Sequence, residues 1–138
     1  MKRREFLQTV GGAAGALAAG SEWARANTPV DLPRRRLGRT GWEVSVIPFS
    51  GLALTRDEQE TCTAAVRTAL DRGVNYLDVA PAYGNGVCEN RLGGALDGVK
   101  RDTFYLACKT KARDRDGARM ELERSLARLK TDYFDLYQ

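Results

Sequence analysis

The chain has 138 residues, of which 43% are hydrophobic and 29% are charged, and it contains no His. This length allows at most one domain, and the composition excludes a disordered or membrane-spanning protein. The formal net charge of +4 comes from residues 1–36, which hold seven Lys or Arg and three Asp or Glu, whereas residues 37–138 are balanced. The folded part therefore gives no reason to expect nucleic-acid binding.

The first 26 residues have the layout of an export signal. A basic start, Lys2–Arg4, precedes the apolar, Gly/Ala-rich segment Thr9–Gly20, which is too short to span a bilayer. Arg3–Gln8 resembles the twin-arginine motif, and Ala24-Arg25-Ala26 offers small residues to signal peptidase. We therefore predict a signal peptide over residues 1–26, recognition by the twin-arginine machinery and a periplasmic or otherwise exported protein. The alternative is a disordered basic tail that is never exported.

A short linker and a hairpin are predicted next. Residues 27–36 contain Pro29 and Pro33, which prevent regular structure, and end in three Arg that we expect to be solvated. In Leu37–Val44, Gly38 and Gly41 flank a turn between two short extended pieces.

From Val44 onward, strands alternate with helices. The predicted strands are Val44–Phe49, Tyr76–Val79, Thr103–Cys108 and Tyr133–Tyr137, and the predicted helices run from Thr55 to about Arg72, from Cys88 to Leu96 and from Asp116 to Leu129. Thr55 and Glu58 form a capping-box pattern, Asp116 is the expected cap of the last helix, and Gly73 ends the first. Such alternation requires a parallel sheet, and both doubly wound sheets and eightfold barrels satisfy it.

Asn75–Gly86 joins a strand to a polar loop. Asp78 stands at the carboxyl end of the strand and Tyr83 follows on the loop. Active sites of α/β proteins are built at this end of parallel strands. From spacing alone, an Asp that caps the loop and a Tyr that packs fit equally well.

Four stretches, in order, are similar to the aldo-keto reductase family. Asp78–Gly84, Asp-Val-Ala-Pro-Ala-Tyr-Gly, resembles the Asp-Thr-Ala-x-x-Tyr-Gly signature. Arg35–Gly41 resembles the opening hairpin, Phe104–Thr110 the third strand with its Lys-Thr ending, and Leu126–Gln138 the third helix and fourth strand. The similarity covers the chain from about Arg35 to its last residue.

This resemblance implies an α/β fold, the amino-terminal half of a (β/α)8 TIM barrel. Residues 37–138 would supply the hairpin, about four parallel strands and three helices. Because a whole barrel takes roughly 250 residues, we expect a fragment with open sheet edges at Val44–Phe49 and Tyr133–Tyr137.

The resemblance also implies an NADP(H)-dependent oxidoreductase that reduces aldehyde or ketone carbonyls by hydride transfer. Tyr83 would be the general acid, Lys109 would ease release of its proton, and Asp78 would hold Lys109 and lie near the nicotinamide ribose. Gly51 and Leu52 match positions whose backbone approaches the cofactor, although a plain strand-end turn is an equal alternative for them.

Some features depart from the family pattern. The family places a His just beyond the fourth strand and binds NADP(H) largely through its second half, so we expect this chain alone to be inactive. Pro48 and Ser50 replace glycines of the first strand. The alternative function is a non-catalytic binding or regulatory subunit with the same fold. The three cysteines, Cys62, Cys88 and Cys108, have no metal-ligand spacing and are expected to pack in the core.

Overall fold

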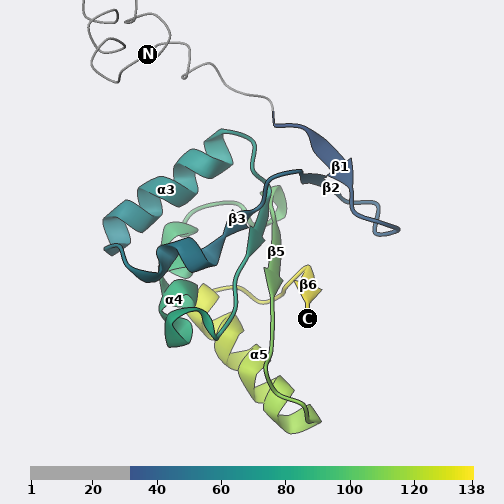
Figure 1. The fold of residues 1–138 in the computed structure, drawn as a ribbon, viewed down its shortest axis with the longest axis vertical. Coiled ribbons are helices and arrows are strands. Elements are labelled where there is room, and N and C mark those ends of the chain that lie inside the picture. The colour runs from purple at the N-terminus through teal and green to yellow at the C-terminus, as the bar shows by residue number, and fades with distance from the viewer. Residues whose placement is uncertain (1–31) are drawn as a thin grey trace, which may run out of the picture.

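A computed structural model describes residues 32–138 (Figure 1). The predicted signal peptide and residues 27–31 of the predicted linker lie outside these residues. The strands are β1 (Arg34–Arg36), β2 (Glu43–Ser45), β3 (Phe49–Ser50), β4 (Tyr76–Asp78), β5 (Tyr105–Cys108) and β6 (Leu136–Tyr137), and the α-helices are α3 (Gln59–Asp71), α4 (Val87–Ala95) and α5 (Arg115–Leu129). Three short 3-10 segments, η2 (Gly51–Thr55), η3 (Tyr83–Gly86) and η4 (Arg101–Thr103), lie between them.

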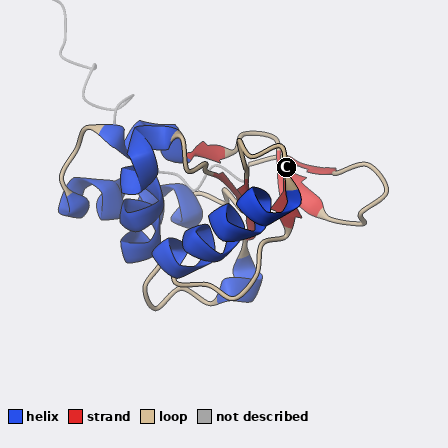
Figure 2. Cartoon of the chain, turned by 90° about the horizontal axis from the view of Figure 1, so that it is seen from below, coloured by secondary structure: helices blue, strands red, loops and turns tan. Residues whose placement is uncertain are grey.

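The described chain is a half barrel, as predicted. β3, β4, β5 and β6 form one parallel sheet in that order, and β1 and β2 form a separate antiparallel hairpin. The three α-helices lie on one side of the sheet (Figure 2). Residues 32–138 form no closed barrel, because β3 and β6 are both edge strands.

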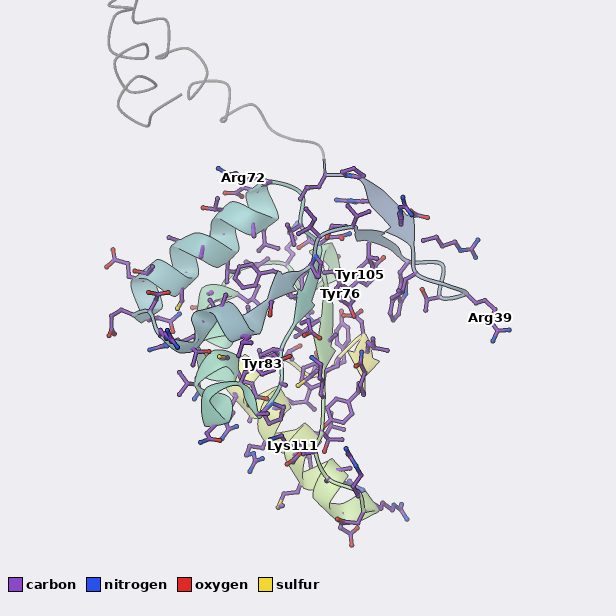
Figure 3. All side chains as sticks on the ribbon, in the orientation of Figure 1. Arg39, Arg72, Tyr76, Tyr83, Tyr105 and Lys111 are labelled. Carbon is purple, nitrogen blue, oxygen red and sulfur yellow. The ribbon has the colours of Figure 1, made fainter. Side chains whose placement is uncertain are left out.

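Alternation along the strands separates the two faces of the sheet. Leu77 of β4 and Leu106 of β5 pair in register, face the helices and are almost fully buried. Tyr76 and Tyr105, which also pair, lie on the other face and are only partly buried. Trp42 of the hairpin stacks on Tyr105 with ring centroids 5.1 Å apart, so the hairpin covers the amino end of that face (Figure 3).

The boundary between the hairpin and the first barrel strand differs from the prediction. The predicted strand Val44–Phe49 is divided. Val44 and Ser45 pair with Arg35 and Arg34 of β1, whereas Phe49, together with Ser50, pairs with β4. Arg34–Arg36, predicted as linker, is therefore a strand, although its side chains are exposed as expected. The Asn75 side chain accepts from Ser45 N at 2.7 Å and donates to Glu43 O at 2.9 Å, which ties β2 of the hairpin to the residue just before β4.

Both predicted N-caps are wrong. Thr55 donates its hydroxyl to Leu52 O within η2, and α3 begins three residues later than predicted, with Glu58 as its N-cap. Asp114 rather than Asp116 caps α5, because its carboxylate accepts from Gly117 N at 2.8 Å. The end of α3 is as predicted, since Gly73 adopts a φ of +89° just beyond it.

Two strands are shorter than predicted, because Arg101–Thr103 forms η4 before β5 and a side chain takes a ladder hydrogen bond before β6. The predicted strands Thr103–Cys108 and Tyr133–Tyr137 shrink to β5 and β6. Leu106 N donates to the Asp135 carboxylate at 2.8 Å, and Arg101 donates to the same carboxylate at 2.6 Å. The ladder between the two strands therefore starts only at Leu136.

The open sheet predicts self-association of the 138-residue chain. Besides the edges β3 and β6, exposed apolar side chains of Ile47 and Leu52 flank β3. Sedimentation at micromolar concentration should show species larger than the monomer, and Ile47→Lys with Leu52→Lys should shift them toward monomer. Met120→Lys, at an equally exposed site on α5, is the matched control and should change nothing. A monomer that unfolds in one cooperative step would contradict this expectation.

Adjacent glycines of α4 give a test of its packing against α5. A Cβ at Gly93 would lie 2.4 Å from Arg128 O and 2.9 Å from Leu129 Cα, whereas one at Gly94 would meet only the flexible Gln59 side chain. Both changes to Ala gain about 1 kcal/mol of helix propensity. In the Ile47→Lys, Leu52→Lys background, which should be monomeric, we expect Gly93→Ala to lower the free energy of unfolding in urea by about 1–3 kcal/mol. Gly94→Ala should leave it nearly unchanged, because displacement of the Gln59 side chain offsets the gain in helix propensity. Equal effects would show that the two helices do not pack this closely.

Candidate active site

Asp78 and Lys109 meet at the carboxyl ends of β4 and β5. Asp78 is the last residue of β4, and Lys109 directly follows β5. Lys109 Nζ donates to the two carboxylate oxygens of Asp78 at 2.5 and 2.6 Å. It also donates to Val79 O at 3.3 Å. These contacts fix the ammonium group at the rim of the open face.

Tyr83 reaches the same ammonium group from the loop after β4. Lys109 Nζ lies 3.4 Å from the Tyr83 hydroxyl and 5.1 Å from the centroid of its ring. The chain folds back here because Gly84, Asn85 and Gly86 all adopt positive φ. This backbone conformation favours glycine, which occupies two of the three positions. The structure thus brings together the three residues that the sequence singles out, and their catalytic roles stay a prediction.

The Asp78–Lys109 pair is partly shielded from water. The side chains of Lys109 and Asp78 are 30% and 23% exposed. Burial acts to lower the pKa of Lys109, but the hydrogen bond and charge of Asp78, with a smaller contribution from Tyr83, raise it above its ordinary value. Lys109 is therefore a cation at neutral pH, positioned to stabilise negative charge on the Tyr83 oxygen.

Gly51 and Leu52 lie beside this group, in η2. A Cβ at Gly51 would lie 2.9 Å from Val79 Cγ2 and 3.0 Å from Asp78 O, so close packing alone requires glycine there. Leu52 is 52% exposed. Their contact with a cofactor stays a prediction.

The profile of the Aldo/keto reductase family matches residues 49–138. The chain belongs to the aldo/keto reductase family. Aldo-keto reductase YhdN of Bacillus subtilis is 38% identical over 114 residues, which cover 75% of this chain and 33% of that protein. L-galactose dehydrogenase of Arabidopsis thaliana is 32% identical, over 74% of this chain and 36% of the relative.

Solved reductases share the fold of this aldo/keto reductase chain. The aldo-keto reductase from Klebsiella pneumoniae, in complex with NADPH, superposes with a TM-score of 0.69 at 28% identity, over 77% of this chain and 38% of the other. The holo form of an aldo-keto reductase from Bacillus halodurans gives 0.65 at 33% identity, over 78% and 39%. The chain spans about a third of the length of the curated relatives it matches.

Two further features of this aldo/keto reductase chain, the Glu89–Arg128 ion pair and the position of Tyr76, were not predicted from the sequence. Glu89 of α4 is completely buried, and Arg128 of α5 donates to it at 2.8 Å. Tyr76 lies on the open face below Asp78, where burial and the Asp78 carboxylate raise the pKa of its hydroxyl. A polar residue among apolar positions of α4 could have signalled Glu89, but its partner 39 residues away could not be read from spacing.

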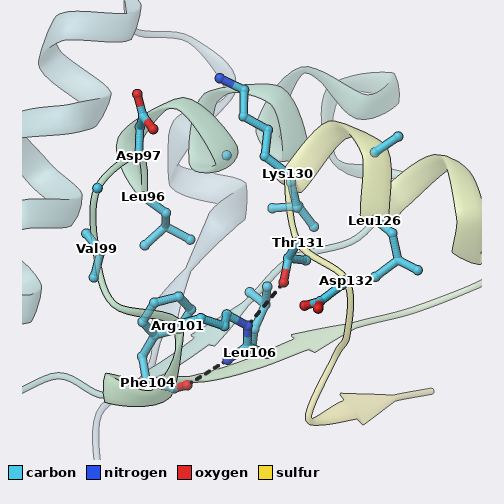
Figure 4. Close-up of a pocket in the computed structure, with 14 residues that line it drawn as sticks. Leu96, Asp97, Val99, Arg101, Phe104, Leu106, Leu126, Lys130, Thr131 and Asp132 are labelled. Atoms are coloured by element: carbon cyan, nitrogen blue, oxygen red, sulfur yellow. Dashed lines mark hydrogen bonds between the residues drawn. The ribbon is translucent and has the colours of Figure 1, made fainter.

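A further cavity in residues 32–138 lies at the opposite end of the strands. It has a volume of about 550 Å³ between the ends of α4 and α5 (Figure 4). Arg101, which donates to Phe104 O at 2.9 Å and to Thr131 Oγ1 at 3.2 Å, is fully engaged there. Both Arg101 and Phe104 precede β5, whereas Lys109 follows it, so this cavity is separate from the candidate active site.

Neither a membrane helix nor a metal cluster occurs in residues 32–138. No helix in this range is both long and apolar enough to cross a bilayer. The Cys, Asp and Glu residues of the same range form no group of three able to hold a metal ion. Cys62, Cys88 and Cys108 are free and buried, and burial raises the pKa of the Cys108 thiol to about 11. The cysteines therefore pack in the core, as predicted.

Proposed function

We propose that this chain supplies the catalytic half of an NADP(H)-dependent carbonyl reductase. The observation that carries the proposal is the chain of contacts from Asp78 through Lys109 Nζ to the Tyr83 hydroxyl. A carbonyl oxygen gains negative charge during reduction, and a proton donor beside it lowers the barrier. Tyr83 is the donor, and the Lys109 ammonium stabilises the phenolate that remains.

The residues present fit a nicotinamide ribose beside Asp78. Each Asp78 oxygen accepts from Lys109 and keeps a further lone pair for a ribose hydroxyl, and the carboxylate is partly exposed. The bound cofactor would supply hydride to the carbonyl carbon. Relatives support this cofactor, since the Klebsiella pneumoniae reductase was solved with NADPH and a yeast relative is named Glycerol 2-dehydrogenase (NADP(+)).

The substrate is a small aldehyde or ketone. Several relatives carry carbonyl substrates in their names, including the Methylglyoxal reductase DkgA of Salmonella typhimurium, 35% identical over 95 residues. The deciding experiment is reduction of a generic aldehyde with NADPH by a hybrid in which the remaining segment of YhdN extends this chain past Gln138. Replacement of Tyr83 by Phe in this hybrid is the test.

We further propose export of this reductase by the twin-arginine route. The support is the order of Lys2–Arg4, the short apolar segment Thr9–Gly20 and the small residues Ala24-Arg25-Ala26. Residues 1–36, fused to a reporter that functions only when exported in folded form, should give an exported signal. Arg3→Lys with Arg4→Lys keeps the charge and should abolish export, whereas Arg34→Lys with Arg35→Lys should not. Export that survives the first pair of changes would exclude this route.

A further inference from the structure

A small cavity opens beside the loop that carries Tyr83. Its volume is about 230 Å³. One wall is the segment Pro81–Asn85, and the other comes from the start of the loop after β5 and from α5. The lining residues are Pro81, Ala82, Asn85, Lys111, Glu121, Arg124 and Arg128. Three cations and one carboxylate therefore line a cavity next to the proposed proton donor, which does not itself line it.

Arg128 is a fixed part of this cavity. Its Nη1 donates to the buried Glu89 carboxylate at 2.8 Å, which neutralises its charge. A Cβ at Gly86 would lie 2.1 Å from Arg128 Nη1 and 2.3 Å from Cζ, so the guanidinium rests on the Gly86 backbone. The absence of a side chain at Gly86 thus lets α5 present Arg128 to the loop of Tyr83.

The one carboxylate of the lining is already occupied. Glu121 Oε2 accepts from Thr110 Oγ1 at 2.5 Å and from Lys111 N at 3.0 Å. The hydrogen bond from Thr110, followed by that from the Lys111 backbone, lowers the pKa of Glu121, which is therefore ionised. Glu121 anchors the loop after β5 through these bonds.

The two remaining cations are open to a ligand. Arg124 Nη2 lies 3.7 Å from Glu121 Oε1, beyond hydrogen-bond distance, and its side chain is 45% exposed. The Lys111 ammonium makes no ion pair or hydrogen bond with any residue from 32 to 138. After pairing of Arg128 with Glu89, two cations face one carboxylate, so the cavity keeps a positive charge.

We infer that this cavity is an anion subsite, in which Lys111 and Arg124 bind a carboxylate or phosphate group of a small molecule. Arg matches such oxyanions with two parallel hydrogen bonds, and Lys binds them as a point charge. The cavity shares the segment Pro81–Asn85 with the Tyr83 loop, so the subsite selects anionic carbonyl compounds as substrates. This last step rests on the proposed function, whereas anion binding itself does not.

Protection of Lys111 from chemical acetylation tests anion binding on the full 138-residue chain. A limiting acetylating reagent is applied at rising inorganic phosphate or acetate and constant ionic strength, and each lysine is followed by mass spectrometry. Phosphate should slow acetylation of Lys111 saturably, whereas Lys100, exposed and outside the cavity, serves as the internal reference. Equal rates for Lys111 with phosphate, acetate and chloride would overturn the inference. Whichever anion protects identifies the group that is bound.

Variants of α5 locate the site and distinguish binding from folding. Arg124→Gln should raise the phosphate concentration for half protection about tenfold, since it removes a charged hydrogen-bond donor. Arg119→Gln removes a cation of the same helix outside the cavity and should have no effect. Glu121→Gln should change it in the opposite direction, because it removes the competing negative charge. Unchanged protection in both Arg124→Gln and Glu121→Gln would overturn the assignment.

The cofactor's phosphates are a second possible source of the anion. NADPH should protect Lys111 no better than phosphate does if the subsite serves the substrate. Stronger protection by NADPH would overturn the assignment to substrate. Because this measurement reports binding and not turnover, it can fail while the reductase proposal stands, and it can succeed where the reductase proposal fails.

Discussion

Tyr83→Phe is expected to lower kcat for aldehyde reduction by about 10²- to 10⁴-fold, the usual cost of removing a general acid. The phenol is the group beside the Lys109 ammonium at the rim, and Phe keeps its ring and removes only the hydroxyl. NADPH affinity should be nearly unchanged, because the hydroxyl serves the carbonyl oxygen. The measurement is steady-state reduction of a neutral aldehyde by the polypeptide extended past Gln138.

Lys109→Met should cause a similar loss, because it removes the charge that stabilises the Tyr83 phenolate. The double variant Tyr83→Phe with Lys109→Met should be little worse than either single variant, since groups that act as one unit are not additive. Tyr105→Phe, on the same open face at the hairpin end, is the matched control and should retain activity. Losses that multiply would show that Lys109 does not act through Tyr83. Full activity in Tyr83→Phe would instead favour the non-catalytic subunit.

The candidate site could be predicted because its parts sit at strand ends. Asp78 and Lys109 are polar residues that close apolar strands, and parallel strands bring their carboxyl ends to one rim. The half barrel could be predicted from the alternation of strands and helices together with the family resemblance. Both rest on order along the chain, which a sequence displays directly.

The parts that could not be predicted depend on side chains from distant segments. Asn75 binds the backbone of β2 thirty or more residues earlier in the chain, and this decides where the hairpin ends. Asp135 accepts the Leu106 N–H and so delays the start of β6 to Leu136. Local patterns favoured Thr55 as a cap, but the η2 turn uses its hydroxyl first. In the first two cases a tertiary contact overrides a local signal, and in the third a competing local hydrogen bond does.

The contact between Glu89 and Arg128 is the other place where one substitution should have a large effect. Glu89 is fully buried on α4, and its remaining partner besides Arg128 is the weak donor Cys108 Sγ at 3.8 Å. Arg128 is 26% exposed, so its aliphatic part lies against the protein while its head closes the pair. Removal of the cation therefore leaves a buried carboxylate without a charged partner.

Arg128→Met is thus expected to lower the free energy of unfolding by about 3 kcal/mol, the lower end of the range for breaking a buried ion pair, because part of Arg128 reaches solvent. Arg124→Met on the same helix, whose contact with Glu121 is exposed and 3.7 Å long, should cost less than about 1 kcal/mol. Urea unfolding followed by circular dichroism compares the two variants in the Ile47→Lys, Leu52→Lys background, which should be monomeric. Arg128→Met with Glu89→Leu should recover most of the loss, since two apolar side chains replace a buried ion pair at little cost. If the double variant is no more stable than Arg128→Met alone, the stranded charge of Glu89 is not the cause, and lost packing of Arg128 on Gly86 is the better explanation.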